Sequence, residues 1–330
     1  MAQATVLGHS VKRHEPEAVF LIVLADKKAK AIDYSEIPFE VVSAASIEPQ
    51  LDQLARKYGI VELNTCIKPR IFEYLFSERS ADRVVYLDPD IRVYAPLAEL
   101  DDVLDGTNIA LTPHILTPIP LDGKNPTENL FLACGLYNLG FIAAKRSPET
   151  QAVMAWWKDR TYAAGYVKPE AGMFVDQLYM NLVPLLFSEV SVMRHEGYNM
   201  APWNLHERTL SRENDVYLVN ATRKLVFFHF SSFRVDSGEL PVHYYNRFSM
   251  RERSDMADLY ARYNEDLKSA GYHRYHGVPW AYGKVETPGR FNELSKKGRA
   301  LCRDGVMWGL RRLPPSFTER AYRVLKESRG

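Results

Sequence analysis

Two aspartates at the end of an apolar run are the residues of this sequence best suited to hold a metal ion. Asp88 and Asp90 follow Val84-Val85-Tyr86-Leu87, a run typical of a buried strand. Side chains two positions apart on an extended chain face the same way, so both carboxylates can converge on one cation. Carboxylate oxygens suit Mg²⁺ or Mn²⁺, which can bridge the phosphates of a nucleotide. A polar turn after the strand is the alternative interpretation.

A histidine near the end of a second apolar run is the natural third ligand. His229 lies in Leu225–Phe230, and the cation Arg234 follows five residues later. An imidazole beside two carboxylates favours Mn²⁺ over Mg²⁺. Arg234 would then be placed to bind a phosphate. A histidine satisfied within the core is the alternative.

Three further segments carry polar groups in apolar surroundings. Asp176-Gln177 is expected at the positive end of an apolar helix, where Asp176 also fits an N-cap. Lys68, just before Pro69, is placed either to bind a phosphate or to lie in solvent. Asn138 and Gly140 interrupt a buried strand, and glycine in a strand often marks the close approach of a ligand or backbone.

A loop dense in polar and aromatic residues, 197–208, is a candidate for binding the acceptor of a reaction. Trp203 could stack on the face of a sugar there. A structural loop pinned by this tryptophan is the alternative.

The elements expected to position these residues alternate between strands and helices, the pattern of βαβ units around a buried sheet. The predicted strands are 19–25, 39–43, 84–87, 109–113, 136–144, 190–194 and 225–230. The predicted helices are 2–13, 51–58, 64–76, 148–162, 173–186 and 254–270. A doubly wound domain normally begins with a strand. Because this chain starts in an amphipathic helix, we expect that its first strand is missing.

Composition excludes several classes of protein. The 330 residues are 46% hydrophobic and 25% charged, as in ordinary globular proteins, and a net charge of +1 gives no electrostatic case for nucleic acid. The three cysteines are far apart, which argues against a disulfide framework or a zinc site and fits a reducing compartment. No signal peptide is visible, and the apolar runs are far shorter than the ~20 residues of a membrane span. A cytoplasmic location is therefore expected.

In chain order, the motifs Lys68-Pro69, Tyr86-Leu87-Asp88-x-Asp90, Asn138-x-Gly140, Asp176-Gln177 and His229 resemble the retaining glycosyltransferases of the glycogenin and lipooligosaccharide galactosyltransferase type. The similarity is closest across Glu62 to Leu100 and Cys134 to Arg234. The last motif of that family is usually His-x-Gly-x-x-Lys, where this chain has Ser231 for the glycine and Arg234 for the lysine.

The resemblance implies a fold and a domain organisation. It implies a single α/β domain of the GT-A, Rossmann-like type with a mostly parallel central sheet. Residues 1–240 would form this catalytic domain, and residues 241–330 a helical extension ending in a basic, aromatic tail.

The resemblance also implies roles for particular residues. Asp88, Asp90 and His229 would bind Mn²⁺, or Mg²⁺, on the diphosphate of a nucleotide-sugar such as a UDP-sugar. Thr65, Lys68, Asn138, Gly140 and Arg234 would bind this donor, with Asn138 and Gly140 lining the sugar pocket. Asp176 and Gln177 would lie beside the anomeric carbon, on the face away from the leaving group. Asn199, Trp203, Asn204 and His206 are the candidates for binding the acceptor or sugar.

The expected reaction is transfer of a hexose to a hydroxyl group with retention of configuration. A glycan, a lipid-linked sugar or a protein would each serve as acceptor. A nucleotidyltransferase with the same sheet architecture and a non-catalytic sugar-nucleotide-binding protein are the alternatives.

The C-terminal tail, Arg290 to Gly330, carries eleven basic and four acidic residues interleaved with aromatic and aliphatic ones. Such a segment is typical of a solvated terminal helix or of a helix that binds an anionic membrane surface. The second interpretation places the protein at the inner face of the cell membrane.

Overall fold

The computed structural model describes residues 1–241 and 245–283, all within one compact unit, Met1–Lys284. The basic tail expected to contact a membrane lies outside the described residues. None of the described helices combines the length and the apolar character needed to cross a membrane.

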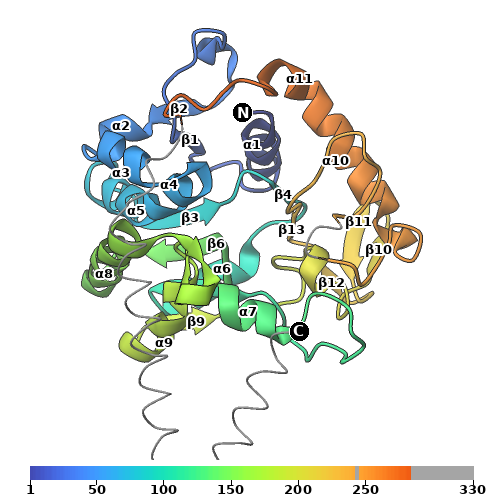
Figure 1. Ribbon diagram of the computed structural model, residues 1–330. Coiled ribbons are helices and arrows are strands. Elements are labelled where there is room, and N and C mark those ends of the chain that lie inside the picture. The colour runs from blue at the N-terminus through green and yellow to red at the C-terminus, as the bar shows by residue number, and fades with distance from the viewer. Residues whose placement is uncertain (242–244, 284–330) are drawn as a thin grey trace, which may run out of the picture. The chain divides into compact units, whose positions relative to one another are not determined.

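A four-stranded sheet with the order β3-β6-β5-β9 forms the centre of the unit (Figure 1). Its strands are β3 (Arg83–Leu87), β5 (Ile109–Pro113), β6 (Tyr137–Lys145) and β9 (Val190–Val192). β5 and β9 are parallel, whereas β6 is antiparallel to both of its neighbours. The sheet is therefore mixed, which corrects the expectation of a mostly parallel one. All of β6 except its two end residues is buried, because helices cover both faces of the sheet, and such a run has the same apolar pattern in either direction.

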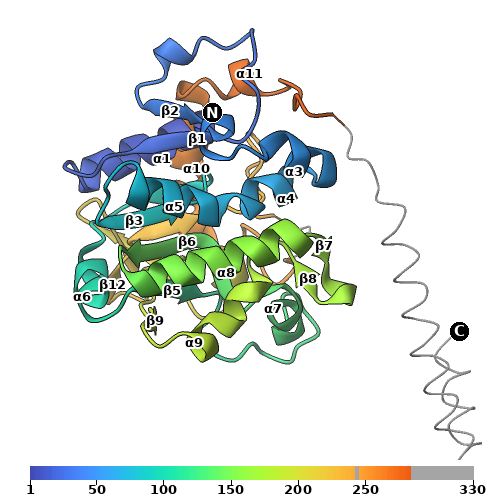
Figure 2. The same cartoon turned by 90° about the vertical axis from the view of Figure 1, so that its left-hand side faces the viewer.

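Helices pack on both faces of this sheet. On one face lie α5 (Lys68–Ser77) and α8 (Pro148–Ala164), whose Phe72 and Trp157 pack with Ile142 of β6 (Figure 2). On the other face lie α1 (Ala2–His14) and α6 (Ala98–Gly106), whose Leu7 and Leu100 join a cluster with Phe141. The polar residues at the strand ends are thus held between two helical layers.

A second, parallel pair of strands follows α1 in the chain. β1 (Leu21–Leu24) pairs with β2 (Glu40–Ser43), and α2 (Ala44–Ile47), α3 (Leu51–Lys57) and α4 (Ile60–Cys66) follow. The helix predicted over 64–76 is divided between α4 and α5, because Pro69 lies in the first turn of α5 and has no N–H to continue the preceding helix. The expectation that a first strand is missing before α1 stays a prediction.

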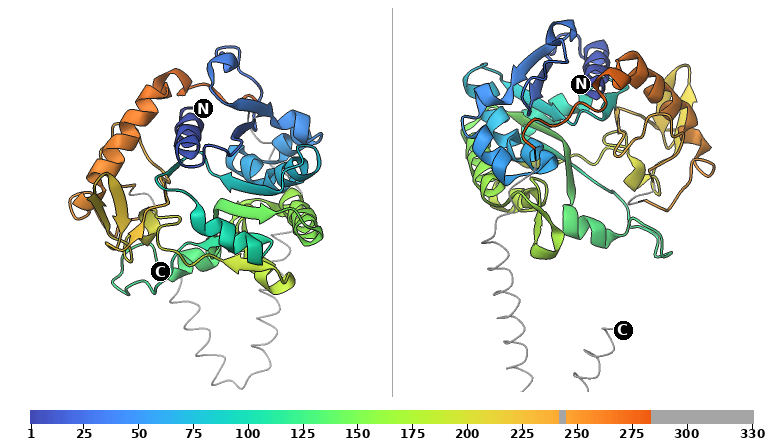
Figure 3. Two further views of the ribbon diagram at one scale, coloured as in Figure 1. Left: turned by 180° about the vertical axis from the view of Figure 1, so that it is seen from behind. Right: turned by 45° about the horizontal axis from the view of Figure 1, so that its top comes forward.

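A short antiparallel pair brings two distant segments together. β4 (Ile91–Val93) pairs with β13 (Phe227–His229), and His229 lies opposite Ile91. α10 (Ala257–Ser269) packs beside α1 and covers β13, with Tyr263 stacked on Phe230 at a ring distance of 3.7 Å (Figure 3). This helix, expected within the C-terminal extension, therefore completes the core of the unit.

The remaining elements are short. The helices are α7 (Glu128–Cys134), α9 (Val183–Leu186) and α11 (Tyr272–Tyr275). The 3₁₀ helices are η1 (Tyr34–Glu36), η2 (Pro169–Ala171), η3 (Leu178–Leu182), η4 (Pro202–Asn204) and η5 (Ser254–Met256). The strands β7 (Val167–Lys168) and β8 (Met173–Phe174) form one small sheet, and β10 (Leu210–Glu213), β11 (Val216–Val219) and β12 (Arg223–Lys224) form another.

Candidate functional site

Asp88, Asp90 and His229 meet where β3 ends and the β4–β13 pair begins. The Asp88 N–H donates to the carbonyl of Gly140 at 2.7 Å, and the Ile91 N–H donates to the carbonyl of Asp88 at 3.0 Å. This turn and the pairing of His229 with Ile91 fix all three side chains. His229 Nε2 lies 3.0 Å from Asp90 Oδ1 and 4.0 Å from Asp88 Oδ2. Each residue offers a ligand atom, and these atoms lie within 4.8 Å of one another.

The electrostatics of the three residues suit a cation. Burial opposes charge on Asp90, but the neighbouring His229 outweighs it and lowers the pKa of the carboxyl group. Burial likewise opposes charge on His229, and the carboxylates of Asp90 and Asp88 outweigh it and raise the pKa of the imidazole. The side chains of Asp88 and Asp90 remain 29% and 24% exposed, so an ion can reach them.

Lys68 is buried beside this group. Its Nζ donates to the carbonyl of Leu139 at 2.8 Å and lies 3.0 Å from Asp176 Oδ2 and 3.6 Å from Asp88 Oδ1. Burial alone would lower the pKa of Lys68, but the carboxylates of Asp176 and Asp88 raise it, so the lysine stays charged. Burial raises the pKa of Asp176 against the pull of Lys68. Lys68 therefore links the carboxylate of Asp88 to that of Asp176.

Asn138 and Gly140 support the imidazole of His229 from the side of β6. Asn138 Oδ1 lies 3.1 Å from His229 Nδ1 and accepts a hydrogen bond from the Gly140 N–H at 3.2 Å. A Cβ on Gly140 would lie 2.4 Å from Cε1 of His229. Gly140 therefore gives space to the side chain of His229, where the sequence predicted the close approach of a ligand or backbone.

The Asp176-Gln177 pair does not open a regular helix, which corrects the helix expected over 173–186. β8 ends at Phe174, Val175 has a φ of 41°, and η3 begins only at Leu178. Gln177 is the N-cap residue but makes no capping bond with its side chain. The Asp176 carboxylate faces Lys68 instead, so it is not the N-cap.

The side chain of Gln177 is held by the backbone around it. Its Oε1 accepts from the Leu139 N–H at 3.2 Å, and its Nε2 donates to the carbonyl of Cys134 at 2.9 Å. Gly135, with a φ of 127°, leaves space for this side chain, since a Cβ there would lie 2.8 Å from Gln177 Cγ.

Two of the predicted donor-binding residues, Thr65 and Arg234, form no hydrogen bond or ion pair with Asp88, Asp90 or His229 in the described part of the chain. The hydroxyl of Thr65 donates within α4, to the carbonyls of Val61 and Glu62. Arg234 is exposed. Ser231, which replaces the glycine of the family motif, does not have a positive φ, and Ser232 takes the left-handed conformation instead, with a φ of 60°. Ser231 therefore replaces the glycine of the family motif without backbone strain.

The predicted acceptor residues belong to a largely buried loop, in which Asn204 is hydrogen-bonded whereas, within the part of the chain that the structure describes, the amide of Asn199 is not. Trp203 is 3% exposed and packs edge-on against His229 and His114, at ring distances of 5.1 Å and 5.3 Å. Asn204 is fully buried and donates to the carbonyls of His114 and Asn199. Trp203 thus has no open face for a sugar, and the arrangement fits a structural loop pinned by its tryptophan.

His206 and Asn199, the other two candidates of this loop, differ in whether their side chains have a polar neighbour. His206 Nε2 lies 3.4 Å from the carbonyl of Thr117. Asn199 is fully buried, has a φ of 55°, and neither atom of its amide finds a hydrogen-bond partner among the described residues.

Sequence reasoning missed two residues of the site. Tyr86 donates to Asp88 Oδ1 at 2.6 Å, and its position two residues before Asp88 on one strand is a signal that was available. His114 directly follows the predicted strand 109–113, and its Nε2 lies 3.3 Å from Asn138 Nδ2. Burial lowers the pKa of His114 to about 4, so this histidine is neutral.

The residues present fit a divalent cation. Two carboxylates and one imidazole are a donor set that Mn²⁺ accepts, and they leave coordination positions for a diphosphate. Lys68 lies beside two carboxylates, Asp88 and Asp176, and His229 lies beside Asp90. A divalent cation would add positive charge to this group of three carboxylates.

Comparisons with known proteins give distant similarity. No family model matches the chain. Two uncharacterized proteins of Bacillus subtilis (strain 168) are similar to it: YfnF, 27% identical over 269 residues that cover 80% of this chain and 87% of YfnF, and YfnD, 23% identical over 268 residues that cover 79% and 83%.

Solved structures that overlap with this fold are glycosyltransferases. The galactosyltransferase LgtC, in complex with donor and acceptor sugar analogs, has a TM-score of 0.46 and 14% identity, covering 81% of this chain and 91% of its own. The bifunctional glycosyltransferase WbbM has a TM-score of 0.41 and 16% identity, covering 71% and 44%. At such scores the overlap is partial, so the chemistry of this chain is argued from its own side chains.

Proposed function

We propose that this chain is a metal-dependent glycosyltransferase that moves a hexose from a nucleoside diphosphate sugar, such as a UDP-sugar, to a hydroxyl acceptor with retention of configuration. The observation that carries the proposal is the convergence of Asp88, Asp90 and His229, with ligand atoms within 4.8 Å of one another, beside the buried Lys68–Asp176 pair. The order of motifs along the chain supports the same function.

Asp88, Asp90 and His229 would hold the cation, Mn²⁺ or Mg²⁺. When bound, the cation neutralises negative charge on the diphosphate, which makes the diphosphate a better leaving group. Asn138 fixes the orientation of the His229 ring, and Tyr86 fixes that of Asp88. Such supporting bonds keep ligands in place and tune their affinity for the ion.

Lys68 and Asp176 would act on the two sides of the reacting bond. The charged lysine lies 3.6 Å from Asp88, within reach of the region where the diphosphate binds. Asp176, held 3.0 Å from Lys68, would place a carboxylate near the anomeric carbon, where positive charge develops. Gln177, fixed by Leu139 and Cys134, is the other residue suited to stabilise that centre.

The outer parts of the donor and acceptor sites are proposed from the resemblance. Arg234 is exposed and would bind a phosphate, and Thr65 stays a candidate for the donor site. Asn138 and Gly140, in the N-terminal part of β6, would line the sugar pocket. A glycan, a lipid-linked sugar and a protein all stay candidates for the acceptor, and contact of 290–330 with the cytoplasmic membrane stays a prediction.

The proposal is tested by incubating the full-length chain with a panel of nucleotide-sugars and Mn²⁺ and identifying the products. Hydrolysis to a nucleoside diphosphate and a free sugar supports the transferase. Asp90→Ala should lower this activity about 1,000-fold, since loss of the ion removes several kcal/mol of charge stabilisation. Asp159→Asn, an exposed carboxylate on α8, is the matched control and should leave it unchanged.

Other products would point to the alternatives. Formation of a nucleoside triphosphate from nucleotide-sugar and pyrophosphate would indicate a nucleotidyltransferase. Binding of a nucleotide-sugar by a well-folded chain without turnover would indicate a non-catalytic binding protein. Turnover that Asp90→Ala does not change would contradict the assignment of the metal ligands.

A further inference from the structure

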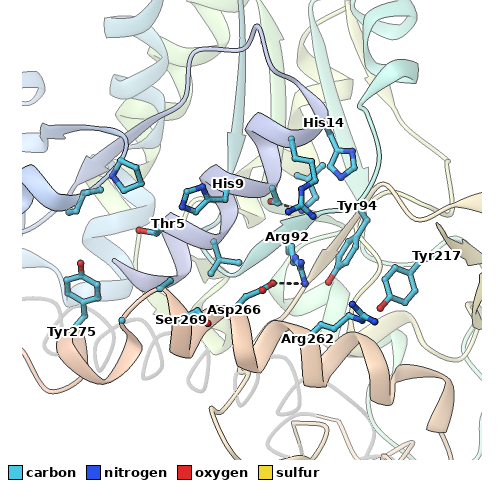
Figure 4. A pocket seen from close by; sticks show the side chains of 18 of the residues that line it. Thr5, His9, His14, Arg92, Tyr94, Tyr217, Arg262, Asp266, Ser269 and Tyr275 are labelled. Atoms are coloured by element: carbon cyan, nitrogen blue, oxygen red, sulfur yellow. Dashed lines mark hydrogen bonds and ion pairs between the residues drawn. The ribbon is translucent and has the colours of Figure 1, made fainter. Parts of the chain in front are cut away.

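A cleft of about 1010 Å³ lies apart from the candidate metal site, between α1, β4, the β10–β11 hairpin, α10 and α11 (Figure 4). Its volume is in the range of small-molecule sites, about 300–1,000 Å³. Asp88, Asp90 and His229 are not among the residues that line it. The function proposed above therefore does not account for this cleft.

Basic side chains dominate the charged lining of the cleft. Five arginines face three carboxylates: Arg13, Arg92, Arg212, Arg262 and Arg274 against Glu36, Asp215 and Asp266. The histidines His9 and His14 also line it. An excess of guanidinium groups in a partly enclosed space attracts anions, because the low-dielectric walls focus the field.

Most of these arginines are held in place by ion pairs. Arg92 of β4 lies 2.7 Å from Asp266 of α10, whereas Arg262 pairs within α10, 2.9 Å from Asp258. Arg274 of α11 pairs with Glu36 of η1. The ion pair of Arg92 engages its Nη1, so the other N–H groups of this guanidinium can donate to a ligand.

The positive charge is least balanced where α1 ends. No ion pair of Arg13 is present among the described residues, and its helix neighbour His14 lies within electrostatic reach of both Arg13 and Arg92. Burial, and then the charges of these arginines, lower the pKa of His14. The carboxylate of Glu15 opposes this effect, so the pKa shift of His14 comes first from burial and places Arg13 and Arg92 near the same imidazole.

A tyrosine adds a hydroxyl at this end. Tyr94 lies under the guanidinium of Arg92, 5.1 Å from the ring centroid to Cζ. Its buried Oη lies beside the Arg92 guanidinium and has no other hydrogen-bond partner in the part of the chain that the structure describes. Figure 4 shows Tyr94, Arg92 and Arg262 gathered in the same part of the cleft. The hydroxyl and the guanidinium can therefore both donate to one oxyanion.

We propose that this end of the cleft binds the oxyanion of a small molecule, a phosphate or a carboxylate, through Arg13, Arg92 and the hydroxyl of Tyr94. Arginine binds both groups with paired N–H donors. The cleft extends from this end to Tyr217 and has space for a body attached to the oxyanion, so a sugar phosphate and a uronic acid serve as probes of the two anions. None of the residues that line the cleft is one of the three candidate metal ligands.

The test is isothermal titration calorimetry on the full-length chain carrying Asp90→Ala, without added metal, so that the candidate metal site does not contribute. The probes are glucose 1-phosphate, glucuronate and uncharged glucose. We expect saturable binding of at least one of the two anions and none of glucose. Binding of glucose 1-phosphate alone identifies a phosphate site, and binding of glucuronate alone identifies a carboxylate site.

The variant that decides is Arg13→Gln, because Arg13 is exposed and has no ion pair among the described residues, so its loss does not threaten the fold. It should weaken binding of the anion at least 10-fold. Lys12→Gln is the matched control, since Lys12 is on the same turn of α1 but does not line the cleft. It should change the affinity less than twofold. Failure of both anions to bind, equal binding of glucose, or equal effects of the two variants would overturn the proposal.

Discussion

Polar side chains gather in two neighbouring regions of this molecule, and the regions differ in how far those groups are satisfied. At the ends of β3 and β13, Asp88 and Asp90 are 29% and 24% exposed, and their charge is only partly balanced. In the 197–208 loop, Asn204 and Arg208 are almost completely buried and donate to backbone carbonyls. Accessible and unbalanced charge indicates chemistry, whereas buried and satisfied polarity indicates structure.

The largest stability effect is expected at the buried Lys68, beside Asp88 of the candidate metal site. Lys68→Met leaves Asp176 buried without its cation and should lower the free energy of unfolding by about 3–5 kcal/mol. Urea denaturation measures the loss. Lys158→Met is the matched control, because the pair of Lys158 with Glu73 is 28% and 21% exposed and should contribute no more than about 1 kcal/mol.

Equal losses in the two lysine variants would mean that Lys68 is not held by the acidic group. The double variant Lys68→Met/Asp176→Leu sharpens the test, since removing both charges should restore part of the stability that the single change costs.

The free energy of unfolding should change by about 3 kcal/mol with pH because of His114, which lies between the two regions. Its pKa is lowered to about 4 in the folded chain, against about 6.5 when unfolded, because it is buried. Between these values the unfolded chain binds more protons, so stability is full above pH 6.5 and is lost as the pH falls to 4. His114→Asn should flatten the dependence of the unfolding free energy on pH in this window. An unchanged slope would assign the acid sensitivity to other groups.

Asn204→Ala tests the structural side of the comparison. It removes the amide that joins Ala201, His114 and Asn199, and it should cost about 2–3 kcal/mol of stability. Asn64→Ala, at an exposed position of α4, should change stability by less than about 0.5 kcal/mol. If the loop is structural, turnover per folded molecule stays near the wild-type value. A selective loss of turnover without loss of stability would return Asn204 to the acceptor site.

Gly140→Ala tests the candidate metal site by adding a single methyl group beside His229. The added Cβ would lie 2.4 Å from His229 Cε1, so the imidazole must move. Affinity for Mn²⁺ should fall about 10-fold, the lower end of effects seen when support of a ligand is lost. Gly106→Ala is the control, since its Cβ meets nothing within 4 Å. Equal affinities in the two variants, measured by calorimetry, would show that Gly140 does not hold the imidazole in place.

Much of the fold follows from apolar patterning. The predicted strand 109–113 agrees with β5 at both ends, and the helix 148–162 is α8, which begins at Pro148 after the Ser147 cap. The missed elements have weaker patterns: β4 is only Ile91–Val93, and the acidic Asp101, Asp102 and Asp105 obscure the apolar face of α6. The direction of strand pairing could not be predicted from the sequence, because burial on both faces gives parallel and antiparallel strands the same apolar pattern.

The candidate site was predictable where residues are close in sequence or end a buried strand. Asp88 and Asp90 are two residues apart in the turn after β3, and His229 lies at the end of β13. The pairing of β13 with β4 that brings them together was not predicted, because β4 is only three residues long. The ion pair of Lys68 with Asp176 was not predictable, because it depends on the irregular turn at Val175. The burial of Trp203 was not predictable either, since it results from packing against His114 and His229.

The most direct test of the central claim is a titration of the full-length chain with Mn²⁺ in the presence of UDP, in which electron paramagnetic resonance reports the free ion. The wild type should bind one Mn²⁺ per chain. Asp90→Asn, which keeps the shape of the side chain but removes its charge, should weaken binding at least about 100-fold, whereas Asp159→Asn should not. Equal Mn²⁺ affinity in the wild type and Asp90→Asn would contradict a metal site built from Asp88, Asp90 and His229.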